Sequence, residues 1–186
     1  LYNSPTYSNG SVTFNGSNQY AFTPNLASVF TSTSYTLECW VSAPTDNGCI
    51  LIEEGHASLD GGWYDSVMEI VSGTLYTSHW SVSGPQSTNA GTFPRVQWNQ
   101  CVATYDGTTI RTYINSVAGS TRTASRQAPW AYGYPYYLAM MGTTSTSLGD
   151  GTYLAGSLAQ FRAYNRALSA DEVTQNYNAN RGRYGI

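Results

Sequence analysis

The chain has 186 residues, of which 41% are hydrophobic, 14% are aromatic and only 10% are charged. This length suits one domain, because all-β sandwiches of this size often fold as a single unit. The sequence contains no Lys, and 8 Arg against 11 Asp and Glu leave a net charge of −3, which excludes nucleic acid as a partner. No apolar run approaches the roughly 18 residues of a membrane span, so membrane insertion is excluded as well.

Short runs of β-branched and aromatic residues alternate with Gly, Asn, Asp and Ser up to about residue 164, which is typical of an antiparallel β-sandwich. Three turn dipeptides tolerate positive φ and predict two-residue hairpin turns. They are Asn15-Gly16 between 11–14 and 19–22, Ser72-Gly73 between 67–71 and 74–77, and Asp106-Gly107 between 102–105 and 110–114. Further strands are expected at 35–43, 49–54, 97–105, 137–142 and 156–164.

The residue order of the segment 35–41 indicates which side of this strand faces the core. Tyr35, Leu37, Cys39 and Val41 share one side of an extended chain, because side chains repeat every two residues along a strand. We expect that side to point into the core.

Only the C-terminus has helical features. Ser169 and Glu172 have the spacing of a capping box, which begins a helix. Val173 and Tyr177 then fall on one face of this helix, and Gly182 is the expected stop. The tail 181–184 is expected to lie as a strap along the sandwich.

Four blocks occur in a fixed order along the chain: 10–16 with Tyr20, 35–41, 98–107 with 113–115, and 153–169. Together they resemble the laminin-G-like domains, which are concanavalin A-like jelly rolls related to pentraxins. The resemblance implies an all-β fold, an antiparallel β-sandwich of the jelly-roll type with one short C-terminal helix. It covers nearly the whole chain, so residues 1–186 are expected to form a single domain.

The ending 176–186 resembles the ends of laminin-G-like domains in tailed-phage structural proteins. That resemblance implies the C-terminal module, or a processed piece, of a longer virion protein. The expected location is therefore the virion surface or the extracellular space.

Three cysteines, at 39, 49 and 101, allow at most one internal disulfide with three possible pairings. The resemblance to pentraxins implies a bridge between the strands of Cys39 and Cys101. A bridge requires Cα atoms within about 7 Å. Two buried thiols are the alternative, since free Cys is among the most buried residue types.

The acidic residues do not form the pair that glycoside hydrolysis requires. Asp65 and Glu69 share one strand face, but four residues at ~3.3 Å each place them roughly 13 Å apart, beyond the ~5–9.5 Å that hydrolases use. His56 and His79 lack a Gly-x-Ser-x-Gly elbow, and we expect both to be surface histidines. The protein is therefore expected not to be an enzyme.

Loop aspartates are the candidates for metal binding. Asp60, Asp65 and Asp150 lie in Gly-rich loops, where carboxylate oxygens can coordinate calcium. The alternative is turn chemistry, because Asp beside Gly commonly stabilises a turn. Ala159 and Gln160 stand where relatives commonly carry an acidic residue, which weakens the calcium site that the resemblance implies. We expect no required cofactor, with calcium as the candidate ion.

The strongest binding signal is a run of alternating aromatic residues that share a face if the chain is extended: Trp130, Tyr132, Tyr134 and Tyr136. Trp63 and Tyr64 form a second aromatic loop of the same kind. Aromatic rings stack on the apolar faces of sugars and also anchor protein interfaces. The alternative is that these loops pack on their own sandwich.

These features favour a non-enzymatic binding module of a virion protein, a lectin-like adhesin that attaches to host-surface glycan. One alternative is a structural capsid-decoration or fibre module, held by contacts with other virion subunits or with further copies of itself in a homo-oligomer. The other is an extracellular carbohydrate-binding module of cellular origin.

Overall fold

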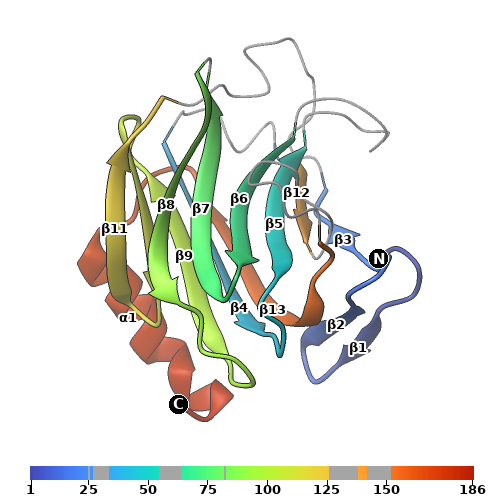
Figure 1. Ribbon diagram of the computed structural model, residues 1–186. Helices are drawn as coiled ribbons and strands as arrows, with labels where there is room; N and C mark the ends of the chain where they lie inside the picture. The colour runs from blue at the N-terminus through green and yellow to red at the C-terminus, as the bar shows by residue number, and fades with distance from the viewer. Residues whose placement is uncertain (25, 27–33, 55–63, 82, 126–137, 142–151) are drawn as a thin grey trace.

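Two antiparallel β-sheets stack on each other to form a sandwich, and one helix lies on its outside (Figure 1). The computed structural model describes residues 1–24, 26, 34–54, 64–81, 83–125, 138–141 and 152–186. The architecture confirms the predicted all-β sandwich with a short C-terminal helix.

The larger sheet has seven strands, and in spatial order they are β1 (Thr6–Ser8), β2 (Ser11–Asn15), β13 (Ala155–Tyr164), β4 (Tyr35–Ser42), β9 (Asn99–Tyr105), β10 (Thr109–Ile114) and β11 (Val117–Thr123). The smaller sheet has six, in the order β3 (Ala21–Phe22), β12 (Leu138–Met141), β5 (Gly48–Glu54), β6 (Tyr64–Val71), β7 (Thr74–Ser81) and β8 (Gly84–Thr92). The five further strands that the sequence predicts correspond to β4, β5, β9, β12 and β13.

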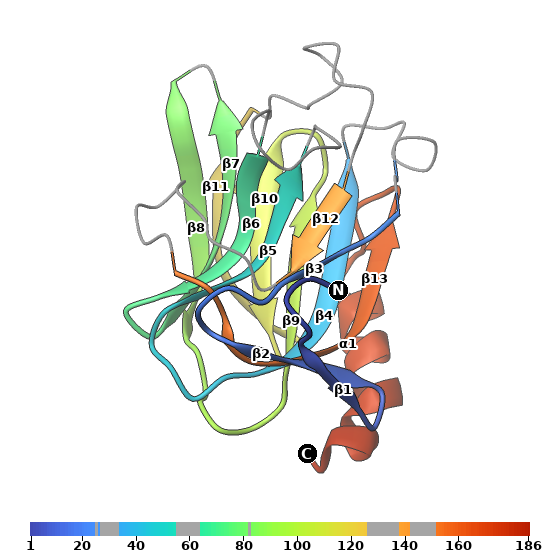
Figure 2. The same ribbon diagram turned by 90° about the vertical axis from the view of Figure 1, so that its right-hand side faces the viewer.

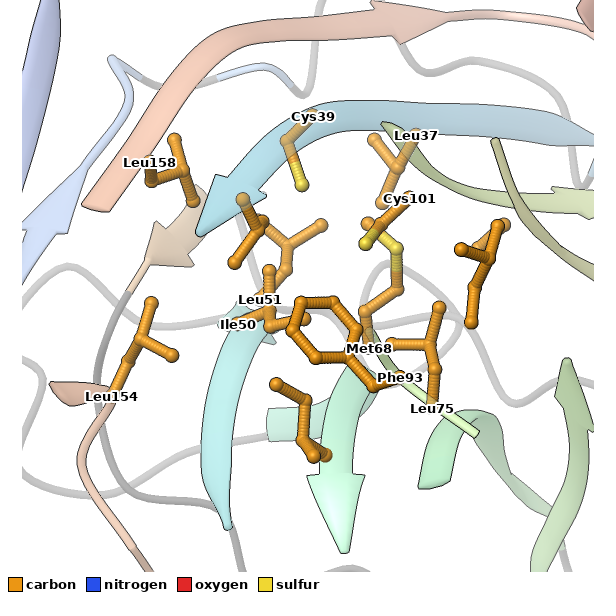
Figure 3. Close-up of a cluster of buried hydrophobic side chains, with 14 of the residues drawn as sticks. Leu37, Cys39, Ile50, Leu51, Met68, Leu75, Phe93, Cys101, Leu154 and Leu158 are labelled. Atoms are coloured by element: carbon orange, nitrogen blue, oxygen red, sulfur yellow. The ribbon is translucent and has the colours of Figure 1, made fainter. Parts of the chain in front are cut away.

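The core fills the space between the sheets. The side of β4 that the alternation assigns to the core is buried there, with Tyr35, Leu37, Cys39 and Val41 all in the main apolar cluster. The facing sheet contributes a matching set of apolar side chains, several of which are drawn in Figure 3: Ile50, Leu51, Met68, Ile70 and Leu75. The two-residue period therefore predicts the inner face of this central strand correctly.

The hairpin predicted between β6 and β7 is confirmed. Val71 pairs with Thr74 across the two turn residues. Ser72 and Gly73 have φ values of 48° and 74°, the positive pair that a tight two-residue hairpin turn needs.

The hairpin predicted between β9 and β10 forms, but its loop is longer than the predicted two-residue turn at Asp106-Gly107. Tyr105 pairs with Ile110, so residues 106–109 lie between the paired positions, and the Asp106 N–H donates to the Thr109 carbonyl at 3.4 Å. The Asp106 carboxylate accepts hydrogen bonds from the backbone N–H groups of Thr108 at 2.9 Å and Thr109 at 2.8 Å. These bonds stabilise the turn through the side chain as well as the backbone.

The hairpin predicted at Asn15-Gly16 is wrong. The strand before the dipeptide, β2, pairs with β1 and β13 in the larger sheet, whereas β3 after it pairs with β12 in the smaller sheet. A turn does form, because Asn15 Oδ1 accepts from the N–H groups of Ser17 at 2.9 Å and Asn18 at 3.2 Å. Turn chemistry specifies a local reversal of the chain, but it does not specify which sheet the next strand joins.

The C-terminal helix α1 (Ala170–Asn180) begins as the sequence predicts. Ser169 caps the N-terminus, and Glu172 completes the capping box. The expected stop at Gly182 is wrong, because a 3₁₀ turn, η2 (Arg181–Tyr184), continues the helix. Gly185, with a φ of 75°, ends it instead.

Helix α1 packs on the outer face of the larger sheet (Figure 2). Val173 is fully buried and joins Val102, Tyr113 and Leu168 in a second, smaller apolar cluster. This second core fixes the helix on the sheet and so determines where η2 lies.

Cys39 on β4 stands directly opposite Cys101 on β9, and both sulfur atoms lie in the core (Figure 3). The structure has these two residues and Cys49 as free thiols, which is the alternative to the disulfide. Burial raises the pKa of each thiol well above its ordinary value, so all three are protonated and shielded.

We expect a thiol-specific reagent to label no cysteine in the folded protein and all three in denaturant. The reason is burial, since Cys39 and Cys101 are 0% exposed and Cys49 is 2% exposed, and because the thiolate is the reactive form. Titrating the reactive thiols before and after unfolding, without reductant, measures how many cysteines are accessible in each state. A single thiol in denaturant would contradict the free-thiol assignment and show that two of the three cysteines are bridged, and Cys39 and Cys101 are the pair that face each other.

Candidate functional site

An open pocket of about 400 Å³ lies against the larger sheet beside η2. It is lined by Ser8, Asn9, Ser11, Thr13, Trp98, Ala159, Arg183 and Tyr184. These residues come from the β1–β2 hairpin, from β13, from the segment before β9 and from the C-terminal turn. Figure 2 shows β1, β2 and the C-terminus at the same end of the molecule. We call this site the outer pocket.

The β1–β2 hairpin supplies the polar wall of the outer pocket. Asn9 and Gly10, with φ values of 51° and 76°, form its tight turn. Phe14 points into the core, so the two-residue period places Ser11 and Thr13 on the outer face. Their hydroxyl groups and the Asn9 amide are therefore directed away from the sandwich interior.

Two aromatic rings, Trp98 and Tyr184, line the outer pocket beside these polar groups, and Trp40 packs beneath Tyr184. Trp40 is fully buried on the outer face of β4. The ring of Tyr184 stacks on it with centroids 4.1 Å apart, and Trp98 leans on Tyr184 at 5.0 Å. Burial raises the pKa of Tyr184. The positive charges of Arg183 and Arg162 lower it by less, so the phenol is neutral at neutral pH.

Arg183 is the charged residue among the side chains that line the outer pocket. Its guanidinium lies over the Tyr184 ring, 5.8 Å from the centroid. It forms no ion pair with any residue that the structure describes. A Cβ on Gly10 would lie 2.6 Å from Arg183 Nη2, so the glycine leaves the space that the guanidinium occupies.

A buried polar network holds α1, and with it η2, on the sheet. Glu38 on β4 is 0% exposed. Its carboxylate pairs with Arg162 on β13 at 3.1 Å, and it accepts hydrogen bonds from Gln100 on β9 at 3.0 Å and from Asn176 on α1 at 2.8 Å. Because one buried carboxylate is satisfied by three separate elements, the helix is held in a single position on the sheet.

Most of the predicted site residues lie outside the described residues: Asp60, Trp63, Trp130, Tyr132, Tyr134, Tyr136 and Asp150. Tyr64 and Asp65 are the first residues of β6. Glu54 pairs with Tyr64 on one side and with Leu138 on the other. Tyr64 and Leu138, the first residues of β6 and β12, therefore lie at neighbouring strand ends of the smaller sheet, at the far end of the sandwich from the C-terminus in Figure 1.

The predicted surface position of His79 is wrong. This residue of β7 is 0% exposed. Its Nε2 is hydrogen-bonded with the Tyr35 hydroxyl, and its ring packs edge-on against Tyr105 with centroids 4.7 Å apart. A polar ring can enter a core when its nitrogen has a partner there, and the alternation of β7 gave no sign of that partner.

Within the ranges that the structure describes, no group of three or more His, Cys, Asp or Glu side chains could hold a metal ion. Asp60 and Asp150 lie outside those ranges. The calcium site therefore stays a prediction.

Sequence reasoning missed the outer pocket. It assigned Trp98 to a strand block and treated Arg183 and Tyr184 as a tail that straps the sandwich. The available signal was an Arg next to an aromatic residue at the end of a chain that has few cations. That signal gave no indication that the tail meets the β1–β2 hairpin.

A family model described as the concanavalin A-like lectin/glucanases superfamily, of the laminin G type, matches residues 15–174. No curated protein sequence matches the chain significantly. Within the described residues, no helix is long and apolar enough to cross a membrane.

Several solved structures share the fold. A native heptameric SAP-like pentraxin from Limulus polyphemus is 16% identical with a TM-score of 0.61, over 88% of this chain and 79% of the pentraxin. Botulinum neurotoxin type C, whose cell entry depends on interaction with two ganglioside molecules, is 15% identical with a TM-score of 0.62, over 91% of this chain. A sialidase from Trypanosoma rangeli is 16% identical with a TM-score of 0.67, over 95% of this chain. The chain spans only 42% of the toxin structure and 28% of the sialidase, and these identities establish the fold alone.

Proposed function

The chain belongs to the concanavalin A-like lectin/glucanases superfamily, and from that premise we propose that it is a non-enzymatic module that binds glycan. The observation that carries the proposal is the outer pocket, where aromatic rings lie beside hydroxyl and amide groups. Solved structures of the same fold include a toxin that interacts with gangliosides, which supports the ligand class.

The chemistry of the outer pocket suits a sugar. Trp98 is partly exposed, and an aromatic ring can stack on the apolar C–H face of a pyranose. Ser11, Thr13 and Asn9 can both donate and accept hydrogen bonds, as sugar hydroxyls do. The volume of about 400 Å³ lies within the range of roughly 300–1,000 Å³ for small-ligand sites, which suits one or two sugar units.

Binding without hydrolysis is proposed because no carboxylate lines the outer pocket. Glycoside hydrolysis generally uses a pair of acidic residues on either side of the scissile bond. Glu38, on the same strand as Trp40, is fully buried and occupied by Arg162, Gln100 and Asn176.

For the biological setting we propose a virion-surface adhesin that attaches to host-surface glycan. The support is the resemblance of residues 176–186 to the ends of laminin-G-like domains in tailed-phage structural proteins. A parent gene among phage structural genes is the expected finding. A gene among secreted enzymes or surface proteins of a cellular genome would favour a carbohydrate-binding module of cellular origin instead.

A structural assembly module is the second candidate, favoured by aromatic residues on the sheet edges. Tyr7 on the edge strand β1 is 69% exposed, and Phe22 on the edge strand β3 is 37% exposed. Tyr2, 43% exposed, packs on Phe22 with ring centroids 5.6 Å apart. Exposed aromatic residues on sheet edges suit contacts with another subunit or another copy of the chain. Association in sedimentation experiments together with no glycan binding would favour this candidate.

We expect the purified chain to bind a defined subset of a glycan array saturably, and Trp98→Ala to reduce that binding at least tenfold, because the stacking surface is lost. Trp130→Ala is the companion variant, since it tests the aromatic segment that the sequence predicts as a binding site. Arrays run with calcium and with a chelator test the predicted ion. Binding that survives Trp98→Ala and is lost in Trp130→Ala would move the site to that segment. An array without any binding would contradict the glycan proposal.

A further inference from the structure

We propose that the outer pocket selects sugars that carry a carboxylate group, and that Arg183 is the residue that binds this group. The inference rests on the proposed glycan-binding function and adds the charge class of the ligand. Its basis is a cation in the pocket that the protein itself leaves unpaired.

Four of the described arginines are held in ion pairs: Arg95 with Asp46, Arg111 with Asp106, Arg162 with Glu38, and Arg166 with Glu172. Arg122, Arg181 and Arg183 are in none of these pairs, and of these three it is Arg183 that lines the outer pocket. The fold therefore leaves one guanidinium available in a pocket that has no negative charge of its own.

No described Asp or Glu side chain forms an ion pair with Arg183. Among described residues, Asp171 lies in the first turn of α1. With a rise of ~1.5 Å per residue, it stands about 15 Å from the C-terminal end of the helix, where η2 begins. Glu38 lies nearer, but its carboxylate is fully buried and satisfied by its own partners. A ligand that brings a negative charge would therefore meet an attractive potential.

The geometry favours a carboxylate over a point anion. A guanidinium is a planar fork whose N–H groups match the two oxygens of a carboxylate in a bidentate pair. The packing over the Tyr184 ring at 5.8 Å restricts the plane of the Arg183 fork. Ser11 Oγ donates to the Ser8 carbonyl at 2.9 Å and Thr13 Oγ1 is hydrogen-bonded with Ser157 Oγ at 2.7 Å, and each hydroxyl oxygen keeps a lone pair that can accept from a ring hydroxyl of the same sugar.

The test measures binding of four methyl glycosides to the full 186-residue chain by calorimetry or NMR titration. Two of the methyl glycosides carry a free carboxylate, those of N-acetylneuraminic acid and of glucuronic acid. The other two are the same glycosides with the carboxylate converted to its methyl ester. The ester keeps the shape of the sugar and removes its charge. Glucose 6-sulfate is the additional probe that separates carboxylate recognition from general anion binding.

Two substitutions form a matched pair. Arg183→Gln removes the cation of the pocket. Arg181→Gln removes a cation two positions earlier that lies over the Tyr177 ring at 6.0 Å and does not line the pocket. We expect the wild-type chain and Arg181→Gln to prefer at least one acid over its ester by about 10- to 100-fold, the size of a charge-assisted contact. Arg183→Gln should bind the acid and the ester equally.

The outcomes distinguish this inference from the function on which it rests. Equal affinity of acid and ester in the wild-type chain, with neutral glycans bound on the array, would overturn the inference and leave the glycan proposal standing. Acid preference that persists in Arg183→Gln, or an equal preference for the sulfate, would overturn the role of Arg183 or the carboxylate class. No binding of any sugar, on the array or in solution, would remove both.

Discussion

Replacing Trp40 with alanine should lower the free energy of unfolding by about 3–5 kcal/mol, the range for deleting a fully buried large aromatic side chain. Trp40 is 0% exposed. It stacks on Tyr184 at 4.1 Å and on Tyr177 at 6.0 Å, so its removal leaves a cavity between the sheet and the C-terminal helix. Chemical denaturation measures the loss. Hydrogen exchange should show faster exchange in residues 181–186 than in the wild-type chain.

Trp40→Phe is the control for this substitution. It keeps a ring in the stack and removes an indole N–H that has no hydrogen-bond partner among the described residues. Its cost should therefore be well below that of alanine. A Trp40→Ala protein with wild-type stability and unchanged exchange of the C-terminal turn would show that the stack does not hold η2 in place.

Replacing Arg162 with alanine should destabilise the fold by roughly 3 kcal/mol, because it leaves the buried carboxylate of Glu38 without its opposite charge. The value is at the low end of the usual range, since the Arg162 side chain is itself 34% exposed while Glu38 is 0% exposed. Gln100 and Asn176 still donate hydrogen bonds to the carboxylate. The double variant Arg162→Ala, Glu38→Gln should recover part of the loss, because it removes the buried charge.

Arg166→Ala is the matched comparison for Arg162→Ala. It breaks another Arg–Glu pair of the chain, with Glu172 at 2.6 Å, but both side chains of that pair are open to solvent at 58% and 38% exposure. Exposed pairs contribute little, so its effect should be small and should decrease further in high salt. Equal effects of the two substitutions would contradict the role assigned to the buried network.

How much of the fold the sequence predicts depends on whether the signal is local. The hairpin at Ser72-Gly73 and the capping box at Ser169 form as predicted, because each is determined by neighbouring residues. The dipeptide Asn15-Gly16 makes its turn, yet the strand after it crosses to the other sheet. Sheet membership is determined by long-range packing, which a turn motif does not encode.

The outer pocket also depends on long-range packing, and the sequence did not predict it. It joins Ser11 on β2, Trp98 before β9 and Arg183 in the C-terminal turn. Their proximity depends on how α1 is seated by Glu38 and Trp40, and no spacing in the sequence reveals that arrangement. The sequence predicted binding by Trp63, Tyr64 and the aromatic residues of 130–136, and it gave no role to Trp98 and Tyr184, which meet Arg183 in the structure.

An NMR titration of the ¹⁵N-labelled chain with a glycan selected from the array tests most directly whether the outer pocket is the binding site. The predicted result is a saturable shift of the Trp98 indole N–H signal, accompanied by shifts of the Arg183 and Tyr184 amides, with little change at residues 64–66 and 138–141. Shifts confined to those residues and to 126–137, with an unchanged Trp98 signal, would contradict the account and assign binding to the aromatic segments that the sequence predicts.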